Sequence, residues 1–570
     1  MITEAGERPG QWDETVGVLV VGSGAAGLTT AATAAELGVG AKVIEKTELI
    51  GGTSSVSGGG MWVPNNHHVV DVGVSDDRET ALEYMRLVSG GRADEAILAA
   101  LVDRGPEMVR FFEDALGFAF EAYPSIGPTL DYRYHLPGAR HGGRTLDGGR
   151  FQLTELGDWA PRLRSGTTAG WVIRKSVYYA ERLYLRGSIA DLAARGDADS
   201  PEAGFVGGGA ALVARLLKAC LDRGVDLVTS TAATALIVHD GRVIGAWVDG
   251  PQGRRAIRAT HGVMLASGGY EWNEELKRRY MSRPLTHPAS PSDVGHGDGL
   301  LLGLSVGAEV AGLGDAWWTP TIEVGPPGSG VNGAPMTMMS RTERGLPHTL
   351  IVNRHGMRFA NEALNYYDFP ATLGHVYDTA DGPANLPAFL VLDQQYRSRY
   401  PLLQTKSDGI AAPDPYWLTR ADTLDELAEA IGVPSDALRA TVERFNGFAR
   451  SGVDEDFHRG ESEWDREWGD PDHGPNVCLG TIEEGPFYAV QLRAGALGTK
   501  GGLRIDDRGR VCAAAAEAQT IPGLYAAGNV AAGSVPWGYT GAGATLGPAC
   551  TFAYAAARDL AAAPVLAAHP

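Results

Sequence analysis

The first strong pattern along the chain is an apolar run, then glycines, then a helix-like segment. Residues 16–21 (VGVLVV) are almost continuously apolar, which is typical of a strand buried on both faces. The next segment predicts a helix to about Leu37, with Gly38 as its stop, and residues 41–44 predict a second strand. This strand–helix–strand order predicts an α/β fold built on a parallel sheet.

The turn between the first strand and the helix reads GSGAAG, residues 22–27. Gly22 permits the tight turn, Gly24 lets the backbone approach a pyrophosphate, and Gly27 lets the helix pack closely on the strand. Glu45 ends the second strand, where an acid suits the hydroxyls of a ribose. We therefore predict a dinucleotide site; the alternative is a glycine-rich turn that binds nothing.

Two further stretches favour FAD over NAD. Residues 47–66 supply many small side chains, which suits a long FAD crossing the domain, and residues 523–534 predict a strand that ends at Gly528-Asn529. The chain thus returns to its nucleotide fold near the C-terminus. The predicted FAD contacts are Gly22, Gly24, Ala25, Ala26, Gly27, Glu45, Lys46, Gly52, Thr53, Ser54, Ser57, Gly58, Gly59, Gly60, Ala233, Ala266, Ser267, Gly268, Gly528, Asn529, Ala544, Thr545 and Leu546.

The amino-acid composition of the chain changes after Asp315. Residues 206–230 still predict a helix and then a strand, whereas the stretch after Asp315 is rich in aromatic residues, proline, glycine and methionine. We predict that residues 1–315 and 490–570 form the FAD-binding domain. Residues 316–489 are predicted to be an inserted domain that holds most of the irregular sequence.

The net charge and composition of the chain limit which molecules we expect it to bind. The chain has 570 residues and a formal net charge of −20, which disfavours nucleic acid and anionic lipid. The N-terminus is polar and acidic, unlike a signal peptide, and no run of about 20 apolar residues exists. We expect a cytoplasmic protein. Four cysteines stand far apart and predict neither a disulfide framework nor a CxxC motif: Cys220, Cys478, Cys512 and Cys550.

Five groups of residues together resemble the FAD-dependent 3-ketosteroid Δ1-dehydrogenases of the fumarate-reductase-like flavoprotein superfamily. The resemblance implies a Rossmann-like FAD-binding domain of the GR2 type, an inserted α+β catalytic or cap domain, and non-covalent FAD. It implies 1,2-dehydrogenation of a 3-ketosteroid. With no second nucleotide motif, the electrons would pass to an external acceptor such as a quinone. The segments are GSGAAGL (22–28), GGTSSVSGGGMWVPNN (51–66), ASGGYEWN (266–273), GTKGGL (498–503) and AAGN…YTGAGATLGPA (526–549).

Tyr539 lies in a loop of glycines directly before the last predicted helix, roughly residues 544–560. The helix directs the positive end of its dipole at this loop. The resemblance implies that the Tyr539 hydroxyl and the Gly543 N–H bind the ketone oxygen of the substrate. The alternative is a loop tyrosine that packs on the flavin or caps the helix.

The resemblance also implies a tyrosine base. By its spacing after Asn361-Glu362 the base is Tyr366, with Tyr367 left open, and it would remove a proton from C2 while C1 gives hydride to FAD N5. A free phenol has a pKa near 10, so it needs a nearby charge or hydrogen bond that the sequence does not show. Tyr132, or else Tyr134, would support the base. The alternative is that these are ordinary aromatic residues of a domain interface.

Other aromatic, methionine and histidine residues carry weaker signals. Some could line a flat apolar cavity or simply belong to the core: Trp317, Trp318, Met336, Met338 and Met339. His67-His68 and His296 have no third ligand at metal spacing, so no metal site is predicted.

Three other functions stay open at this point. One is a fumarate- or urocanate-type ene-reductase, disfavoured because Lys500 stands where a histidine is usual. Another is dehydrogenation at a different ring position (Δ4) or of a non-steroid cyclic ketone, since the bulky segment 133–200, with its long stretch 181–204, could reshape the pocket. The third is a non-catalytic flavoprotein that only carries electrons.

Overall fold

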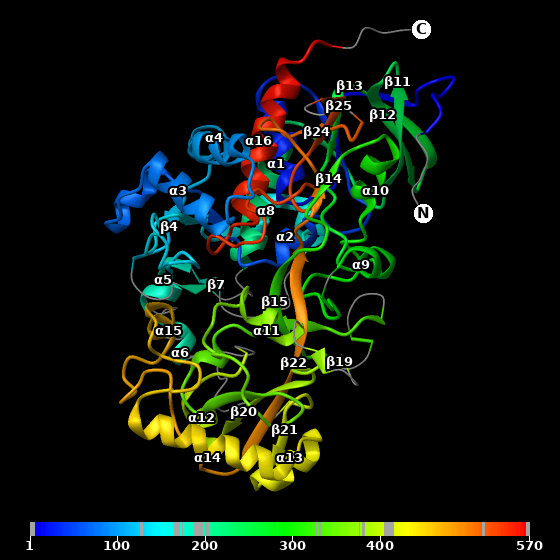
Figure 1. Ribbon diagram of the computed structural model, residues 1–570. Helices are drawn as coiled ribbons and strands as arrows, with labels where there is room; N and C mark the ends of the chain where they lie inside the picture. Colours follow the sequence, from blue (N-terminus) through cyan, green and yellow to red (C-terminus); the bar gives the residue numbers. More distant parts are fainter. Residues whose placement is uncertain are drawn as a thin grey trace.

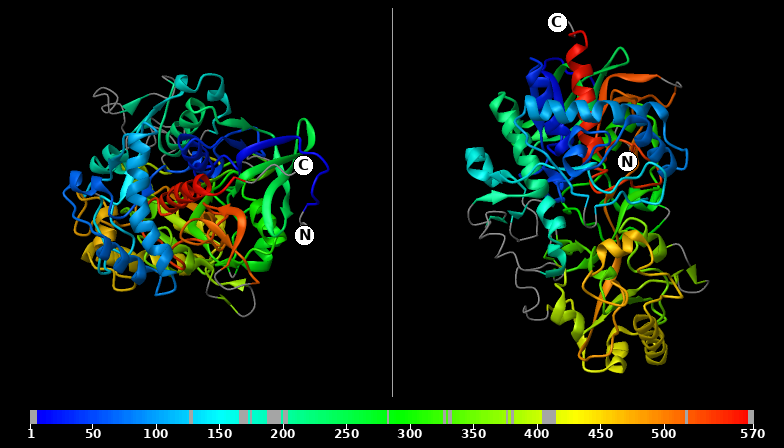
Figure 2. Two further views of the ribbon diagram at one scale, coloured as in Figure 1. Left: turned by 90° about the horizontal axis from the view of Figure 1, so that it is seen from above. Right: turned by 90° about the vertical axis from the view of Figure 1, so that its left-hand side faces the viewer.

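The computed structural model places two parts end to end, each built around its own sheet (Figures 1 and 2). One part holds both ends of the chain, and the other is made of residues from the middle. The structure describes residues 6–565 apart from 126–128, 165–171, 174, 187–197, 200–203, 282, 326–327, 330–332, 375–376, 379–381, 404–414 and 516–518.

The first sheet has β1 (Glu14–Val21) at its centre. β1 pairs in parallel with β2 (Ala41–Ile44) on one side and with β13 (Gly253–Leu265) on the other. β10 (Asp226–Val228) extends the sheet beyond β2, and β25 (Thr520–Ala526) pairs with the end of β13. The predicted parallel sheet and the return of the chain to it near the C-terminus are therefore confirmed.

Helices cover this sheet. α1 (Ala25–Glu36) packs against α8 (Gly208–Asp222) and α16 (Leu546–Ala562), and α16 also packs on α4 (Glu95–Asp114) (Figure 1). The predicted first helix is confirmed, and the last begins two residues later than expected. A shorter helix of the same part is α10 (Asp298–Ser305).

The second sheet is antiparallel, in the order β16-β15-β22-β20-β17, with β21 also paired to β22. Two helices that the sequence reading missed cover it, α13 (Leu424–Ile431) and α14 (Ser435–Ser451), so this region is less irregular than predicted. The strands are β15 (Ala316–Glu323), β16 (Thr337–Met339), β17 (Thr349–Val352), β20 (Ala388–Asp393), β21 (Thr419–Ala421) and β22 (Phe487–Thr499).

Smaller elements fill the space around the two sheets. None of the helices in the described part of the chain is long and apolar enough to cross a membrane. The first sheet also contains antiparallel strands, namely β11 (Ala232–His239), β12 (Arg242–Gly250) and β24 (Arg510–Cys512). The principal remaining elements are α2 (Gly52–Val56), α3 (Arg78–Val88), α9 (Glu274–Tyr280), α11 (Phe369–Gly374), α12 (Gln394–Arg399), α15 (Glu463–Trp468), β3 (Met61–Trp62) and β5 (Thr145–Asp147).

One strand, β22, runs continuously from one part to the other (Figure 1). Its first half pairs with β20 up to Leu492, and its second half pairs with β15 from Arg493 to Thr499. Its end is held in the FAD part, where Thr499 Oγ1 accepts the Tyr270 N–H at 2.9 Å. The boundary that the sequence suggests at 489/490 lies inside this strand.

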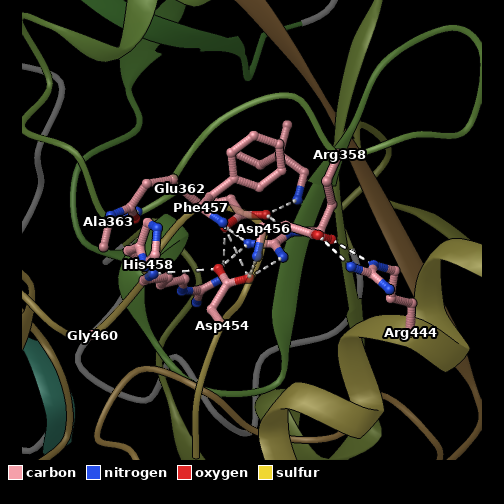
Figure 3. A network of polar contacts seen from close by, with 12 residues as sticks. Arg358, Glu362, Ala363, Arg444, Asp454, Asp456, Phe457, His458 and Gly460 are labelled. Carbon is pink, nitrogen blue, oxygen red and sulfur yellow. Dashed lines mark hydrogen bonds and ion pairs between the residues drawn. The ribbon is translucent and has the colours of Figure 1, made fainter.

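A buried ion network holds the chain just before Tyr366 (Figure 3). Arg358 contacts Glu362 at 2.7 Å and Asp454 at 2.8 Å, and Arg459 contacts Glu362 at 3.3 Å; these side chains are 4% exposed or less. Two buried cations thus balance two buried carboxylates. Because breaking such a network leaves an uncompensated charge, it fixes one conformation of this segment.

We expect Glu362→Gln to lower the free energy of unfolding by about 3–5 kcal/mol, since it leaves Arg459 buried without a carboxylate. Burial alone would raise the pKa of Glu362, but Arg358 more than offsets it and holds the pKa below its usual value. The network therefore stabilises the fold above the unfolded-state pKa, and this contribution is lost as pH falls through the folded-state pKa. Urea denaturation at neutral and acidic pH measures both effects.

The matched control is Asp456→Asn, in the more exposed pair with Arg444 at 2.6 Å (Figure 3). We expect it to cost less than about 1 kcal/mol. Equal losses in the two variants would show that the buried network does not hold this segment.

Candidate active site

A cavity of about 500 Å³ connects the two parts of the molecule. One end is the glycine-rich turn after β1, and the other is a group of tyrosines. All the residues predicted to contact FAD line it except Gly27 and Ala544. A Cβ on Gly27 would lie 1.9 Å from the Gly22 carbonyl oxygen. Gly27 therefore lets α1 pack closely on β1, as predicted, and does not line the cavity.

The turn after β1 is shaped for close backbone approach. Gly22 has φ +106°, and a Cβ there would lie 2.5 Å from the Ala266 carbonyl oxygen. Gly24 is the N-cap of α1 and has no side-chain cap, while the Ala25 N–H donates to Ser54 Oγ at 3.1 Å. A helix N-terminus presented to a cavity in this way suits a pyrophosphate.

The carboxylate of Glu45 is held in position beside this turn. Its Oε2 accepts the Ser23 N–H at 3.1 Å and the Ser23 hydroxyl at 2.7 Å, and its Oε1 accepts the Thr47 N–H at 2.9 Å. The Thr47 hydroxyl also faces Oε1 at 3.0 Å and the Leu49 carbonyl at 2.8 Å. A carboxylate has about four acceptor positions, so when this hydroxyl donates to Leu49 one position is open to a ribose hydroxyl. The neighbouring Lys46 is ion-paired with Asp298 at 2.6 Å. These residues fit the adenosine diphosphate half of FAD.

The other end of the cavity brings together three predicted tyrosines from separate segments. The Tyr366 ring lies 5.3 Å from that of Tyr132 and 5.8 Å from that of Tyr539, and the Tyr132 and Tyr539 rings are 5.0 Å apart, all edge-on. The Tyr366 hydroxyl donates to the Tyr539 hydroxyl at 3.3 Å. The Tyr132 N–H also donates to the Thr540 carbonyl at 3.0 Å, which ties two of the segments together.

The neighbouring tyrosines that the sequence left open do not line the cavity. The Tyr367 hydroxyl donates to Asp315 at 3.2 Å and accepts from Lys500 at 3.3 Å. Lys500 lies 3.5 Å from Asp315 and also donates to the Gly538 carbonyl, so it supports the Tyr539 loop from behind. Burial lowers the pKa of Lys500 to about 8, against the opposing effect of Asp315. Tyr134 likewise stands outside the lining.

Gly543 brings the Tyr539 loop to the cavity wall. It has φ +89°, and a Cβ would lie 2.4 Å from the Gly60 carbonyl oxygen. Thr545 and Leu546, at the start of α16, line the cavity beside it. The positive end of the α16 dipole therefore faces the tyrosines.

Burial sets the protonation of the phenols. It raises the pKa of Tyr539 well above 10, with Tyr366 adding to the effect, so Tyr539 stays a neutral hydrogen-bond donor. Burial and then Tyr132 raise the pKa of Tyr366 as well, while the hydrogen bond with Tyr539 and the charge of Arg341 oppose them. Arg341 is thus a nearby charge of the kind that the sequence did not reveal.

The sequence reading missed several residues that line the cavity. Trp317 and Met339 line the cavity as anticipated, whereas Trp318 points away and donates to Asp315 at 2.8 Å. Met336 and Met338 also stand outside the lining, and most of the bulky segment 181–204 lies outside the described residues. The missed lining residues include Tyr123, Tyr179, Thr231, Glu271, Arg341, Trp468 and Leu497.

Away from the cavity, His67 and His68 meet Glu113 of α4. Their Nε2 atoms lie 3.0 Å and 2.6 Å from its two oxygens, and one ligand atom from each residue lies within 4.8 Å of the others. Glu113 is distant in sequence, so no spacing could reveal this third group. The absence of a metal site stays a prediction.

We expect Gly22→Ala to lower the flavin content of the purified protein severely, because the left-handed backbone and the Ala266 carbonyl leave no room for a methyl group. Flavin absorbance per mole of protein measures it. The matched control is Gly40→Ala, in the same strand–helix–strand unit, where a Cβ meets nothing within 4 Å. Full flavin content in Gly22→Ala would contradict the placement of the cofactor.

Comparison with known proteins agrees with this geometry. Residues 17–546 match the FAD binding domain family. The chain is 42% identical to 4-oxocyclohexanecarboxylate 2-dehydrogenase of Sinomonas cyclohexanicum, covering 96% of this chain and 93% of that protein. It is 40% identical to 3-oxosteroid 1-dehydrogenase of Mycolicibacterium smegmatis, covering 96% and 97%.

Among solved structures, 3-ketosteroid Δ1-dehydrogenase of Sterolibacterium denitrificans in complex with 1,4-androstadiene-3,17-dione matches with a TM-score of 0.84 at 33% identity. The match covers 96% of this chain and all of that one. The family and the lining of the cavity together establish FAD as the cofactor. The chain therefore belongs to the FAD binding domain family, and within it to the group of FAD-dependent 3-ketosteroid Δ1-dehydrogenases and their relatives.

Proposed function

We propose that this protein dehydrogenates a cyclic ketone at the carbons α and β to its carbonyl, the reaction that turns a 3-oxosteroid into a 3-oxo-Δ1-steroid. The observation that carries the proposal is the meeting of Tyr132, Tyr366 and Tyr539 at one end of the FAD cavity. This arrangement offers a ketone one hydrogen-bond donor and one base side by side. An electron carrier has no need of such a pair.

Each residue has a distinct task in this proposal. The neutral Tyr539 hydroxyl and the Gly543 N–H donate to the ketone oxygen and stabilise the negative charge that develops there. Tyr366 removes a proton from the α carbon, C2 of a steroid, and Tyr132 supports it by edge contact. FAD, when bound, supplies the acceptor for the hydride that leaves the β carbon. The cavity excludes bulk water from the phenols, which are all buried.

Two substrate classes fit this chemistry. A 3-oxosteroid is favoured by the 40% identical relative and by the steroid-bound neighbour of known structure. A single-ring ketone of the 4-oxocyclohexanecarboxylate type is favoured by the 42% identical relative. A histidine clamp for an ene-reductase has no counterpart in the described lining of the cavity.

Two further parts of the proposal are that FAD is bound non-covalently and that its electrons pass to an external acceptor. No histidine or cysteine is among the described residues that line the cavity, which supports non-covalent FAD. Since the sequence has no second dinucleotide motif, we propose an external acceptor such as a quinone.

The test is to mix the holoenzyme, without oxygen, with androst-4-ene-3,17-dione and, separately, with single-ring ketones. We expect bleaching of the oxidised flavin band and formation of the α,β-unsaturated product with at least one of them. A ketone that bleaches the flavin without forming that product, or no bleaching with any ketone, would overturn the proposal.

The control variant for this test is Tyr539→Phe, which keeps the ring but removes the donor. It should slow flavin reduction by roughly 10²–10³. An unchanged rate would mean that another group polarises the ketone.

We expect Tyr366→Phe to lower kcat by about 10²–10⁴, the range typical of a lost general base. The adjacent Tyr367→Phe is the matched control and should stay within about tenfold, since its hydroxyl faces Asp315 outside the cavity. Because burial raises the pKa of Tyr366, the rate of the unaltered enzyme should rise with pH through the alkaline range. Steady-state rates of the unaltered enzyme and of the two variants, measured across pH, check the loss in kcat and the pH dependence. The reverse ranking would assign the base to Tyr367.

A further inference from the structure

One cation at the tyrosine end of the cavity has no carboxylate partner. Arg341 lines the cavity, and its side chain forms no ion pair with any described residue. Glu343, the nearest acid in sequence, accepts the main-chain N–H of Arg341 at 2.9 Å instead. By contrast Lys46, at the other end, is paired with Asp298.

The surroundings of Arg341 hold its guanidinium without neutralising it. Its Nη1 donates to the Tyr179 hydroxyl at 3.3 Å, and its Cζ lies 5.4 Å from the centre of the Trp468 ring and 5.9 Å from that of Tyr179. Aromatic faces orient a cation but carry no full negative charge. Nε and Nη2 find no acceptor among the described side chains. They form the planar fork with which arginine binds carboxylates.

We propose that Arg341, flanked by Tyr179 and Trp468, binds a carboxylate of the substrate, so that the ring ketone turned over here carries a carboxylate away from its carbonyl. The inference rests on the proposed function, because the same cavity binds the ketone. It explains why an unpaired cation is kept in a mostly apolar cavity, where an uncompensated charge is costly.

The position of Arg341 limits the length of the substrate. Arg341 shares the tyrosine end of the cavity with the proposed ketone site. It packs on Trp468, and Trp464 links Trp468 to Tyr132, with ring centres 5.9 Å and 5.1 Å apart. A carboxylate on the opposite carbon of a single ring stays at this end of the cavity, whereas a carboxylate on the side chain of a steroid lies several rings farther from the carbonyl.

The test compares 4-oxocyclohexanecarboxylate with its neutral methyl ester, using holoenzyme of the unaltered protein and of Arg341→Met. We expect the unaltered enzyme to have a kcat/KM at least tenfold higher for the acid. Arg341→Met should lower kcat/KM for the acid by roughly 10–10²-fold more than for the ester, with the extra loss mostly in KM. Arg341→Lys should restore part of the loss.

The matched control is Arg283→Met. Arg283 is also partly buried and packs on an aromatic ring, with its Cζ 4.4 Å from the centre of Trp318, but it does not line the cavity. Removing it should leave the ratio of acid to ester unchanged. An equal change in that ratio for both variants would overturn the inference in favour of a general charge effect.

Binding without turnover separates this inference from the proposed function. Calorimetry with cyclohexanecarboxylate, which has no ketone, should show binding to the unaltered holoenzyme and none to Arg341→Met. Equal kcat/KM for acid and ester, or equal losses on both in Arg341→Met, would assign Arg341 to the support of the tyrosines and overturn the subsite. Turnover of a neutral steroid but not of the acid would overturn it too, while leaving the proposed function intact.

Discussion

The site depends on one close backbone contact, between residues 60–62 and the loop 541–547. The Trp62 N–H donates to the Gly543 carbonyl at 3.0 Å, and a Cβ on Gly547 would lie 2.0 Å from the Trp62 carbonyl oxygen. Gly60 belongs to the FAD side of the cavity, and the loop carries Tyr539. This contact, which only glycine permits, therefore fixes the FAD side of the cavity and Tyr539, the phenol proposed to bind the ketone, relative to each other.

The proposed base, Tyr366, is held in place by a different kind of interaction. Tyr366 follows a segment that buried ion pairs hold, whereas Tyr539 precedes a segment that close steric contact holds. Tyr132 comes from a third segment and joins the Tyr539 loop through a main-chain hydrogen bond at 3.0 Å. The three phenols thus gain their mutual geometry from independent supports, which favours a preorganised site over one assembled on binding.

A feature could be predicted from the sequence where the residues that form it lie close together along the chain. The turn at Gly22, the acid at Glu45 and the glycine loop around Tyr539 are short patterns whose chemistry is complete within a few residues. Whether Tyr366 or Tyr367 lines the cavity depends on the direction in which each side chain points. The long-range ion network before them sets that direction, and no local sequence pattern encodes such a network. Arg341 stands in a stretch without periodicity, so only the folded chain reveals that its partners are Tyr179 and Trp468. The missed α14 was readable, since its apolar residues recur at helical spacing.

The continuous β22 has a consequence for how a ligand enters and leaves. In many two-domain enzymes a cleft opens because flexible linkers let one domain swing. Here a single strand pairs with β20 and β15 of the second sheet and continues into the FAD part, where Thr499 Oγ1 accepts the Tyr270 N–H at 2.9 Å. A wide swing would have to bend this strand or break that hydrogen bond. The strand therefore restricts the motion of one part relative to the other. Small molecules would enter and leave through movements of side chains and surface loops.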